Sequence, residues 1–208
     1  MMLLRLIGRP APVTTALIII NSLIFAYGML SQSQQQIIVH YGFIPNELFH
    51  DNSAPLSDSL MRLFTSMFVH ANIAHIAFNL FALAYMGGFA ERSIGVPRFI
   101  VLYILAGLGG ALLYGVVASY ILLTGDSILI GASGAISGVL GISAAMGDMR
   151  GYYWLAIQVF FVFIGSFASI TIAFMAHVGG FLTGLLLTKA MIEHERRKRR
   201  WYSDTFST

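Results

Sequence analysis

Four polar side chains lie within long apolar stretches of this 208-residue sequence, where polar groups are costly and usually functional. They are Ser133, His177, His75 and Asn79. A serine hydroxyl becomes a nucleophile when a neighbouring imidazole accepts its proton, and N–H donors can stabilise the oxyanion that follows. A hydroxyl, a base and hydrogen-bond donors are what acyl transfer requires, so the four residue types together predict that chemistry.

No acidic side chain accompanies these residues, because the carboxylates lie in loops or at the ends of the apolar stretches. A Ser-His dyad is therefore a simpler expectation than a Ser-His-Asp triad. The chain has no cysteine, which excludes a thiol nucleophile, a thiolate metal site and disulfides. His70 and His75 are five residues apart, about 140° around a helix, so they do not form a zinc pair on one face. We expect neither a metal nor a cofactor.

Each of these residues also has a structural explanation. His75 and Asn79 are four residues apart on one helix face and could serve only as hydrogen-bonding groups between helices. Ser133 opens an apolar stretch, where its hydroxyl could cap the free N–H groups of a helix start. The glycines at 134, 138 and 141 could serve only for close packing. For each motif taken alone, the structural explanation is the stronger one.

The composition indicates a membrane protein. Hydrophobic residues make up 57% of the chain and charged residues 10%, against roughly 45 to 50% and about 25% in soluble domains. Apolar side chains must therefore face lipid, which excludes nucleic-acid readers and ordinary cytosolic enzymes. Apolar runs of spanning length predict an all-α polytopic bundle with six transmembrane helices, at about 13–30, 67–90, 99–123, 132–146, 152–167 and 170–189.

The basic residues predict the orientation of this single membrane domain. With six spans and both termini in the cytoplasm, every Lys and Arg except Arg62 lies on the cytoplasmic side, as the positive-inside bias requires. Residues 31–66 then form an extracytoplasmic loop, whose apolar content suggests a folded element at the membrane surface. Residues 190–208 form a basic cytoplasmic tail. In that tail, Arg196 to Arg200 are expected to contact anionic headgroups of the bilayer and not a nucleic acid.

Two small-residue faces are expected to bring the serine and the histidine together. His177, Gly180 and Gly184 follow one another at helical spacing, so a groove of low bulk runs through His177. Packing this groove against the glycines of the fourth span would place the imidazole beside the hydroxyl. At about 1.5 Å per residue, His177 and His75 lie at similar depths from the extracytoplasmic face. Gly179 lies roughly 100° around the helix from Gly180 and is expected to tolerate alanine better than Gly180 or Gly184 tolerates valine.

Five motifs occur in order along the chain: Arg62, His70-x4-His75-x3-Asn79, Gly-Gly followed by Glu91-Arg92, Gly131-Ala-Ser133-Gly134, and Ala176-His177-Val-Gly179-Gly180. Together they resemble the rhomboid family of intramembrane serine proteases. The resemblance implies a six-span core of bacterial or archaeal type in a prokaryotic inner membrane. It implies Ser133 as nucleophile, His177 as general base and then acid, and His75 and Asn79 as oxyanion donors with the Ser133 N–H. The implied partners are transmembrane protein substrates, cleaved after small residues without a cofactor.

Two positions depart from the family pattern. Ser137 stands where the family often has an aromatic ring stacked on the base histidine, and Met61-Arg62 stands where it often has Trp-Arg. Arg62 and Glu91 are expected to be structural, and the aromatic run at 152–154 fits a belt at the cytoplasmic membrane surface. The alternative function is an inactive rhomboid-like protein that binds membrane helices. The presence of both dyad residues favours the protease.

Overall fold

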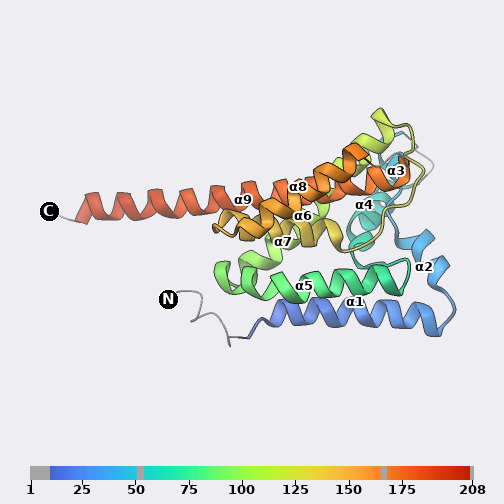
Figure 1. Ribbon diagram of the computed structural model, residues 1–208, viewed down its shortest axis with the longest axis horizontal. Helices are drawn as coiled ribbons and strands as arrows, with labels where there is room; N and C mark the ends of the chain where they lie inside the picture. Colours follow the sequence, from blue (N-terminus) through green and yellow to red (C-terminus); the bar gives the residue numbers. More distant parts are fainter. Residues whose placement is uncertain (1–9, 51–53, 165–167, 207–208) are drawn as a thin grey trace.

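The computed structural model describes residues 10–50, 54–164 and 168–206, and these parts of the chain fold as a bundle of helices (Figure 1). Extended pairing within them is limited to an isolated bridge between Phe43 and Leu129. The expected all-α polytopic bundle is confirmed. In chain order the helices are α1 (Pro12–Leu30), α2 (Gln34–Tyr41), α3 (Pro45–Phe49), α4 (Leu56–Thr65), the 3-10 turn η2 (Ser66–Phe68), α5 (Ile73–Ile94), α6 (Val96–Val116), the π-helical turn η3 (Val117–Ile121), α7 (Ser133–Ala145), α8 (Met149–Ile164) and α9 (Ala168–Phe206).

Four helical segments among the described residues are long and apolar enough to cross a membrane: Pro12–Leu30, Ile73–Ile94, Val96–Ile121 and Phe174–Tyr202. Large apolar side chains such as Leu23 and Phe78 are exposed on α1 and α5, as expected where lipid replaces water. The chain is therefore an integral, multi-pass membrane protein. α7 is a shorter apolar helix, and α8 stands in place of the expected fifth span, whose end at 165–167 lies outside the described residues. The count of six spans stays a prediction.

α7 is the most enclosed helix of the bundle. Every residue from Gly134 to Ala144 is buried, and α7 packs against α6, α9, α5 and α8. A helix surrounded by protein needs no lipid-facing side chains, so its small and polar residues do not contact hydrocarbon. This enclosure explains why the shortest of the apolar segments is stable at the centre of the molecule.

Glycines let α7 and α9 approach until their backbones touch, as predicted. A Cβ atom at Gly180 would collide with the carbonyl oxygen of Gly134, and one at Gly184 would collide with that of Gly138. Gly179 does not face open space. A Cβ atom there would lie 2.9 Å from a backbone oxygen of α6, a milder collision than those at Gly180 and Gly184. That Gly179 tolerates alanine better than those two positions tolerate added bulk stays a prediction. α9 is therefore held by close backbone contacts on two sides.

α5 begins at Ile73, six residues after the predicted start of the second span, because Asn72 caps it. The backbone of Asn72 is extended, and its Oδ1 accepts a hydrogen bond from the His75 N–H at 2.9 Å. The preceding residues form η2 and an extended link. His70 therefore does not lie on α5. The angle of about 140° that was expected to separate His70 from His75 assumed that both lie on one helix, so it does not apply.

The described residues of segment 31–66 form three short helices, and this segment is tied to the chain just before α7. Arg62 donates to a carbonyl of α2 at 3.2 Å and pairs with Glu47 at 3.4 Å, a structural role of the kind expected. Phe43 exchanges two backbone hydrogen bonds with Leu129, at 3.0 and 2.8 Å. Segment 31–66 thus helps to fix the loop that leads to Ser133.

Glu91 on α5 closes the N-terminus of α1, which lies beside α5 (Figure 1). The N-cap residue Ala11 supplies no side-chain acceptor. Instead the buried Glu91 carboxylate accepts from the backbone N–H groups of Val13 at 3.0 Å and Thr14 at 2.7 Å, and from the Thr14 hydroxyl at 2.7 Å. Free N–H groups at a helix start favour an anion, so this contact ties α1 to α5.

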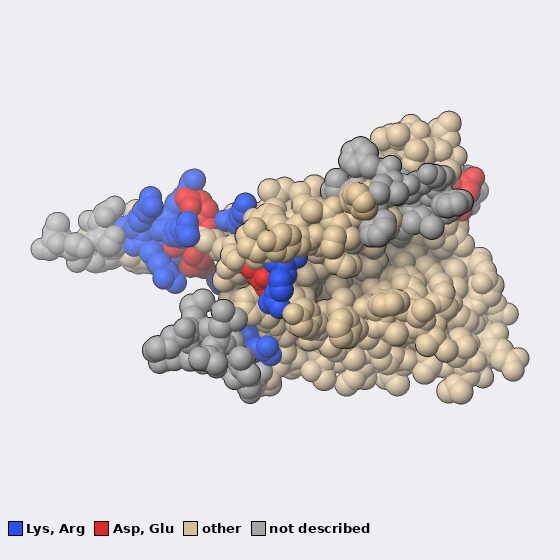
Figure 2. Space-filling view, viewed as in Figure 1, with Lys and Arg blue, Asp and Glu red and all other residues tan. Residues whose placement is uncertain are grey.

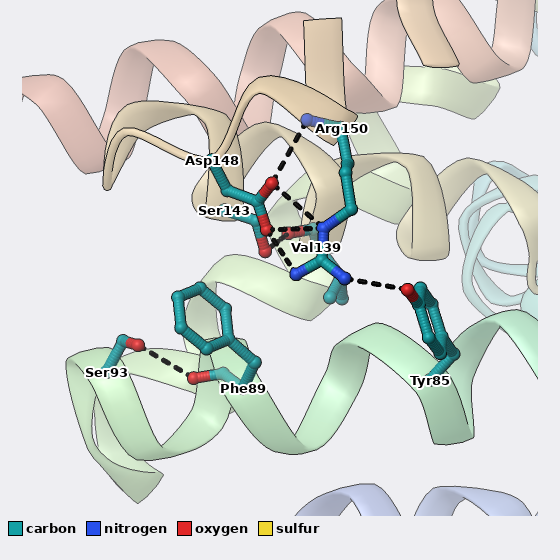
Figure 3. Close-up of polar contacts among 7 residues, drawn as sticks. All are labelled: Tyr85, Phe89, Ser93, Val139, Ser143, Asp148 and Arg150. Atoms are coloured by element: carbon teal, nitrogen blue, oxygen red, sulfur yellow. Dashed lines mark hydrogen bonds and ion pairs between the residues drawn. The ribbon is translucent and has the colours of Figure 1, made fainter. Parts of the chain in front are cut away.

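Arg150 joins the turn between α7 and α8 to α5 (Figure 3). Its guanidinium donates to the Tyr85 hydroxyl at 2.7 Å and to the Asp148 carboxylate at 2.6 and 3.0 Å. The hydrogen bonds from Arg150 hold the pKa of Asp148 below its usual value. The same three residues therefore connect α5 with α8, two helices on either side of α7.

α9 runs for 39 residues, and its last part projects beyond the other helices (Figure 1). Lys and Arg side chains gather on the projecting part, while most of the bundle face in view carries no charge (Figure 2). The expected basic tail is therefore a continuation of the last helix as far as residue 206. Arg5 and Arg9, which also contributed to the predicted orientation, lie outside the described residues.

Candidate active site

Ser133 and His177 meet where α7 begins. Ser133 is the first residue of α7, and its Oγ lies 2.8 Å from Nε2 of His177 on α9, at hydrogen-bonding distance. The alternative role of Ser133 as a helix cap is not observed, because Ala132 is the N-cap residue and no side chain caps α7. The glycine contacts between α7 and α9 allow this approach between residues 44 positions apart.

The start of α7 places positive electrostatic potential around Ser133. Its first intrahelical hydrogen bond runs from the Ile136 N–H to the Ala132 carbonyl at 2.9 Å. The N–H groups of residues 133 to 135 precede that bond, and such groups have no acceptor within the helix. Aligned peptide dipoles add about half a positive charge at this end. Negative charge that develops on a carbonyl oxygen bonded to Ser133 is stabilised by this arrangement.

The hydrogen bonding of His75 indicates which ring nitrogen carries its proton. The Ala71 backbone N–H lies 3.4 Å from His75 Nδ1 and donates to it. A neutral imidazole has one donor and one acceptor nitrogen, so Nε2 is the donor. The His75 N–H is thus on the side of the ring that faces Gly131 and the start of α7.

Gly131 leaves a space between His75 and Ser133. A Cβ atom at residue 131 would lie 2.6 Å from His75 Nε2 and 3.8 Å from Ser133 Oγ. Its φ of +114° is also a conformation that favours glycine. The Gly131 N–H donates to the Ser66 carbonyl at 2.9 Å, which holds the loop in this position. A small group placed in the space contacts both the nucleophile and a hydrogen-bond donor.

Asn79 lies one turn after His75 on α5 and is buried. Its Nδ2 donates to the His75 carbonyl at 2.8 Å. An amide NH₂ group has two donors, and this bond uses one of them. The structure thus brings Asn79 to His75, while no hydrogen bond joins Asn79 to Ser133 among the described residues. This contact within α5 is also compatible with a structural role.

The sequence did not identify the aromatic side chains that lie beside His177. The ring of Trp154 on α8 is 6.4 Å from the His177 ring, and that of Phe174 on α9 is 5.7 Å away. Trp154 was expected in an aromatic belt, but it is half-buried here, whereas its neighbour Tyr153 is exposed. The absence of an aromatic residue at position 137 was the signal that His177 needs another partner.

His70 is the third imidazole near this site. It is buried, and its ring centre lies 5.1 Å from that of His75. No group of three or more His, Cys, Asp or Glu side chains suited to a metal occurs within the described ranges. The two histidines lack the carboxylate or thiolate ligands that usually complete a zinc site.

A small pocket lies beside Ser133, between α6, α7 and α9. Its walls include Met67, Gly107, Ala111 and Leu129. The pocket is narrow because α6 and α9 approach closely at their glycines. Its size and apolar walls suit a small apolar group next to the nucleophile.

A polytopic helical membrane protein with a serine and a histidine in contact near segment 31–66 defines a recognisable class. Residues 57–194 match the family model described as "Rhomboid domain". The chain therefore belongs to the rhomboid family. The match extends from α4 into α9 and contains all four residues predicted for the site.

Known relatives include "Rhomboid protease GluP" of Bacillus subtilis (strain 168), 32% identical over 148 residues that cover 68% of this chain and 28% of that protein. "RHOMBOID-like protein 1" of Arabidopsis thaliana is 33% identical over 134 residues, covering 61% of this chain and 33% of that protein. "RHOMBOID-like protein 6, mitochondrial" of the same plant is 33% identical over 137 residues, covering 61% and 42%. The chain spans about a third of the first two relatives, and the prokaryotic inner membrane stays a prediction.

Proposed function

We propose that this chain is an intramembrane serine endopeptidase that cleaves transmembrane segments of other membrane proteins. The observation that carries the proposal is the 2.8 Å contact between Ser133 Oγ and His177 Nε2 at the start of α7. The pair supplies a nucleophile and a base, and the helix start supplies N–H donors. Membership of the rhomboid family supports the same reaction.

In the proposed acylation step, neutral His177 accepts the Ser133 proton on Nε2 while Oγ bonds to the carbonyl carbon of the scissile peptide. The carbonyl oxygen becomes an oxyanion. We place it in the space beside Gly131, where the His75 Nε2–H and the first N–H groups of α7 converge. The C–N bond then breaks as His177 gives its proton to the leaving nitrogen, and an acyl ester on Ser133 remains.

In the proposed deacylation step, a water molecule attacks the ester carbon while His177 accepts one of its protons. The bond to Oγ breaks and the proton returns to Ser133, so the net reaction adds water across one peptide bond. No acidic side chain is needed to orient the histidine, because packing against Trp154 and Phe174 restrains its ring. The mechanism requires no cofactor.

We propose substrates with a small residue before the scissile bond. The pocket beside Ser133 supports this preference, because its close walls leave no room for a large side chain. A helix in lipid has its carbonyl groups paired internally, so a substrate must unwind locally before Ser133 can attack. Segments with helix-breaking residues are therefore the expected targets.

We further propose that the arginine-rich end of the bundle faces the cytoplasm. Arg98, which pairs with Glu195 of α9, and the basic part of α9 lie toward this end, which supports the orientation through the positive-inside bias. Ser133 then lies toward the opposite face of the membrane. Products are expected to be released on that side.

The proposal is tested by cleavage of a transmembrane reporter by the purified protein in proteoliposomes. We expect wild-type protein to cleave it, and Ser133→Ala and His177→Ala to fall to background with helicity retained. Ser143→Ala is the matched control, because the hydroxyl of this buried serine of α7 donates to the Val139 carbonyl of its own helix, at 3.1 Å. Cleavage by folded Ser133→Ala contradicts the mechanism. A wild-type protein that binds the reporter without cutting it supports the inactive, helix-binding alternative.

A further inference from the structure

A pocket of about 260 Å³ lies at the arginine-rich end of the bundle, away from the candidate active site. The end of α5, the start of α6, the end of α7 and the projecting part of α9 form its walls. Neither the proposed reaction nor the family match assigns a role to it. Its lining combines two kinds of side chain, cationic and apolar.

The cationic side chains of the pocket are Arg98, Arg196 and Arg199, and its acidic side chain is Glu195. Glu195 pairs with Arg98 across the pocket, from α9 to α6, at 2.6 Å. Three guanidinium groups against one carboxylate leave an excess of positive charge. Guanidinium groups bind phosphate through paired, charge-assisted hydrogen bonds.

The apolar side chains place the pocket at the edge of the hydrocarbon layer. Ile94 is the last residue of α5, and Met146 is the C-cap of α7. Arg98 lies in the first turn of α6, and Met191 and Ile192 continue the apolar lining along α9. The end of α5, the start of α6 and the end of α7 all lie at this pocket and mark the boundary of the bundle. The apolar and cationic walls therefore meet at the level where lipid acyl chains meet headgroups.

We propose that this pocket binds one anionic phospholipid, with its phosphate on Arg196 and Arg199 and the start of an acyl chain against Ile94 and Met191. An amphipathic ligand of negative charge uses both halves of the lining. A free phosphate uses only the guanidinium groups, and a zwitterionic lipid brings its own cation to a site with excess positive charge. Binding in this pocket differs from a general attraction of α9 to a charged membrane surface, because only some of the basic residues of α9 line the pocket.

The neighbouring basic residues provide a matched control. Arg197 and Lys198 lie on the same turns of α9 but do not line the pocket, and Arg197 pairs instead with Glu193 at 3.0 Å. Arg196→Gln/Arg199→Gln and Arg197→Gln/Lys198→Gln each remove two positive charges from the exposed part of one helix. Both variants keep the same net charge, so general surface attraction is reduced equally.

The experiment measures lipid binding by the full chain in phosphatidylcholine nanodiscs to which phosphatidylglycerol is added. Native mass spectrometry counts retained lipids, and thermal unfolding reports stabilisation. We expect wild-type protein and Arg197→Gln/Lys198→Gln to retain one phosphatidylglycerol, and Arg196→Gln/Arg199→Gln to bind it about 10-fold or more weakly. Equal weakening in both double variants overturns the proposal in favour of general surface attraction. Stabilisation by inorganic phosphate alone that matches the lipid overturns it in favour of an anion site. Neither outcome bears on Ser133.

Discussion

The indole N–H of Trp154 on α8 lies 3.4 Å from Ser137 Oγ on α7 and donates to it, one turn after Ser133. The Ser137 hydroxyl in turn donates to the Ser133 carbonyl at 2.8 Å. Because the Trp154 ring also lies beside His177, one side chain of α8 contacts both helices that carry the Ser-His pair. The small residue at position 137 makes this possible, since an aromatic ring there would occupy the space next to the indole.

Trp154→Leu is therefore expected to lower kcat by about 10-fold, because His177 loses a ring contact and α7 loses a hydrogen bond. KM should change little, since Trp154 acts on the base and not on the bound substrate. Trp154→Phe keeps a ring and should retain more activity. The measurement is the kinetics of reporter cleavage, normalised to folded protein.

Tyr153→Leu is the control for that experiment, because it removes an exposed aromatic ring from the adjacent position of α8. It should leave kcat unchanged. If both variants lose the same activity, or if Trp154→Leu changes only the melting temperature, Trp154 is a packing residue without a role in positioning His177.

Gly131→Ala should lower kcat by about 10²-fold or more, which is the scale for losing one oxyanion donor. The new methyl group fills the space between His75 Nε2 and Ser133 Oγ. Alanine at a positive φ also strains the backbone, so strain alone must be controlled. Gly147→Ala provides that control, because Gly147 has φ +94° and nothing lies within 4 Å of its Cβ position. Equal activity of the two variants, measured on folded protein, would place the oxyanion elsewhere.

Glu91→Gln should lower the free energy of unfolding by about 2 kcal/mol, because the buried carboxylate accepts three hydrogen bonds at the start of α1. The loss concerns the attachment of α1, so reporter cleavage by the fraction that remains folded should persist. The measurement is thermal or denaturant unfolding. Glu193→Gln, at an exposed position on α9, should leave the same quantity almost unchanged, because an exposed ion pair contributes little. A loss of equal size in Glu193→Gln would show that the cap on α1 contributes nothing specific.

The contact between α7 and α9 could be predicted from the sequence because it depends on local spacing. Gly180 and Gly184 follow His177 on one helix face. A face of glycines lets another helix with small residues approach closely, so the glycines of α7 were the expected partner. The same reasoning did not predict the contact of Gly179 with α6, because a helix in the middle of a bundle has close neighbours on more than one side. Periodicity describes one helix at a time and does not count its neighbours.

The start of α5 and the role of Trp154 could not be predicted for physical reasons. Apolar residues at 67–69 and 71 adjoin the apolar stretch that follows Asn72, so composition extends the span there. The Asn72 cap and the 3-10 turn before it set the boundary instead. Trp154 reaches Ser137 and His177 from a third helix, and its own neighbours in the sequence are aromatic as well. Only the packed bundle shows that Trp154, and not the aromatic residues next to it in the sequence, reaches both Ser137 and His177.

The most direct test of the account is the reactivity of Ser133 toward a fluorophosphonate, because this reagent needs an activated serine but no membrane-embedded substrate. Intact-mass and peptide mass spectrometry give the rate and the site of labelling for wild-type protein and for His177→Gln. The account predicts a single adduct on Ser133 in the wild type and labelling at least about 10²-fold slower in His177→Gln. An adduct on another serine, or equal rates in the two proteins, would contradict the claim that His177 activates Ser133.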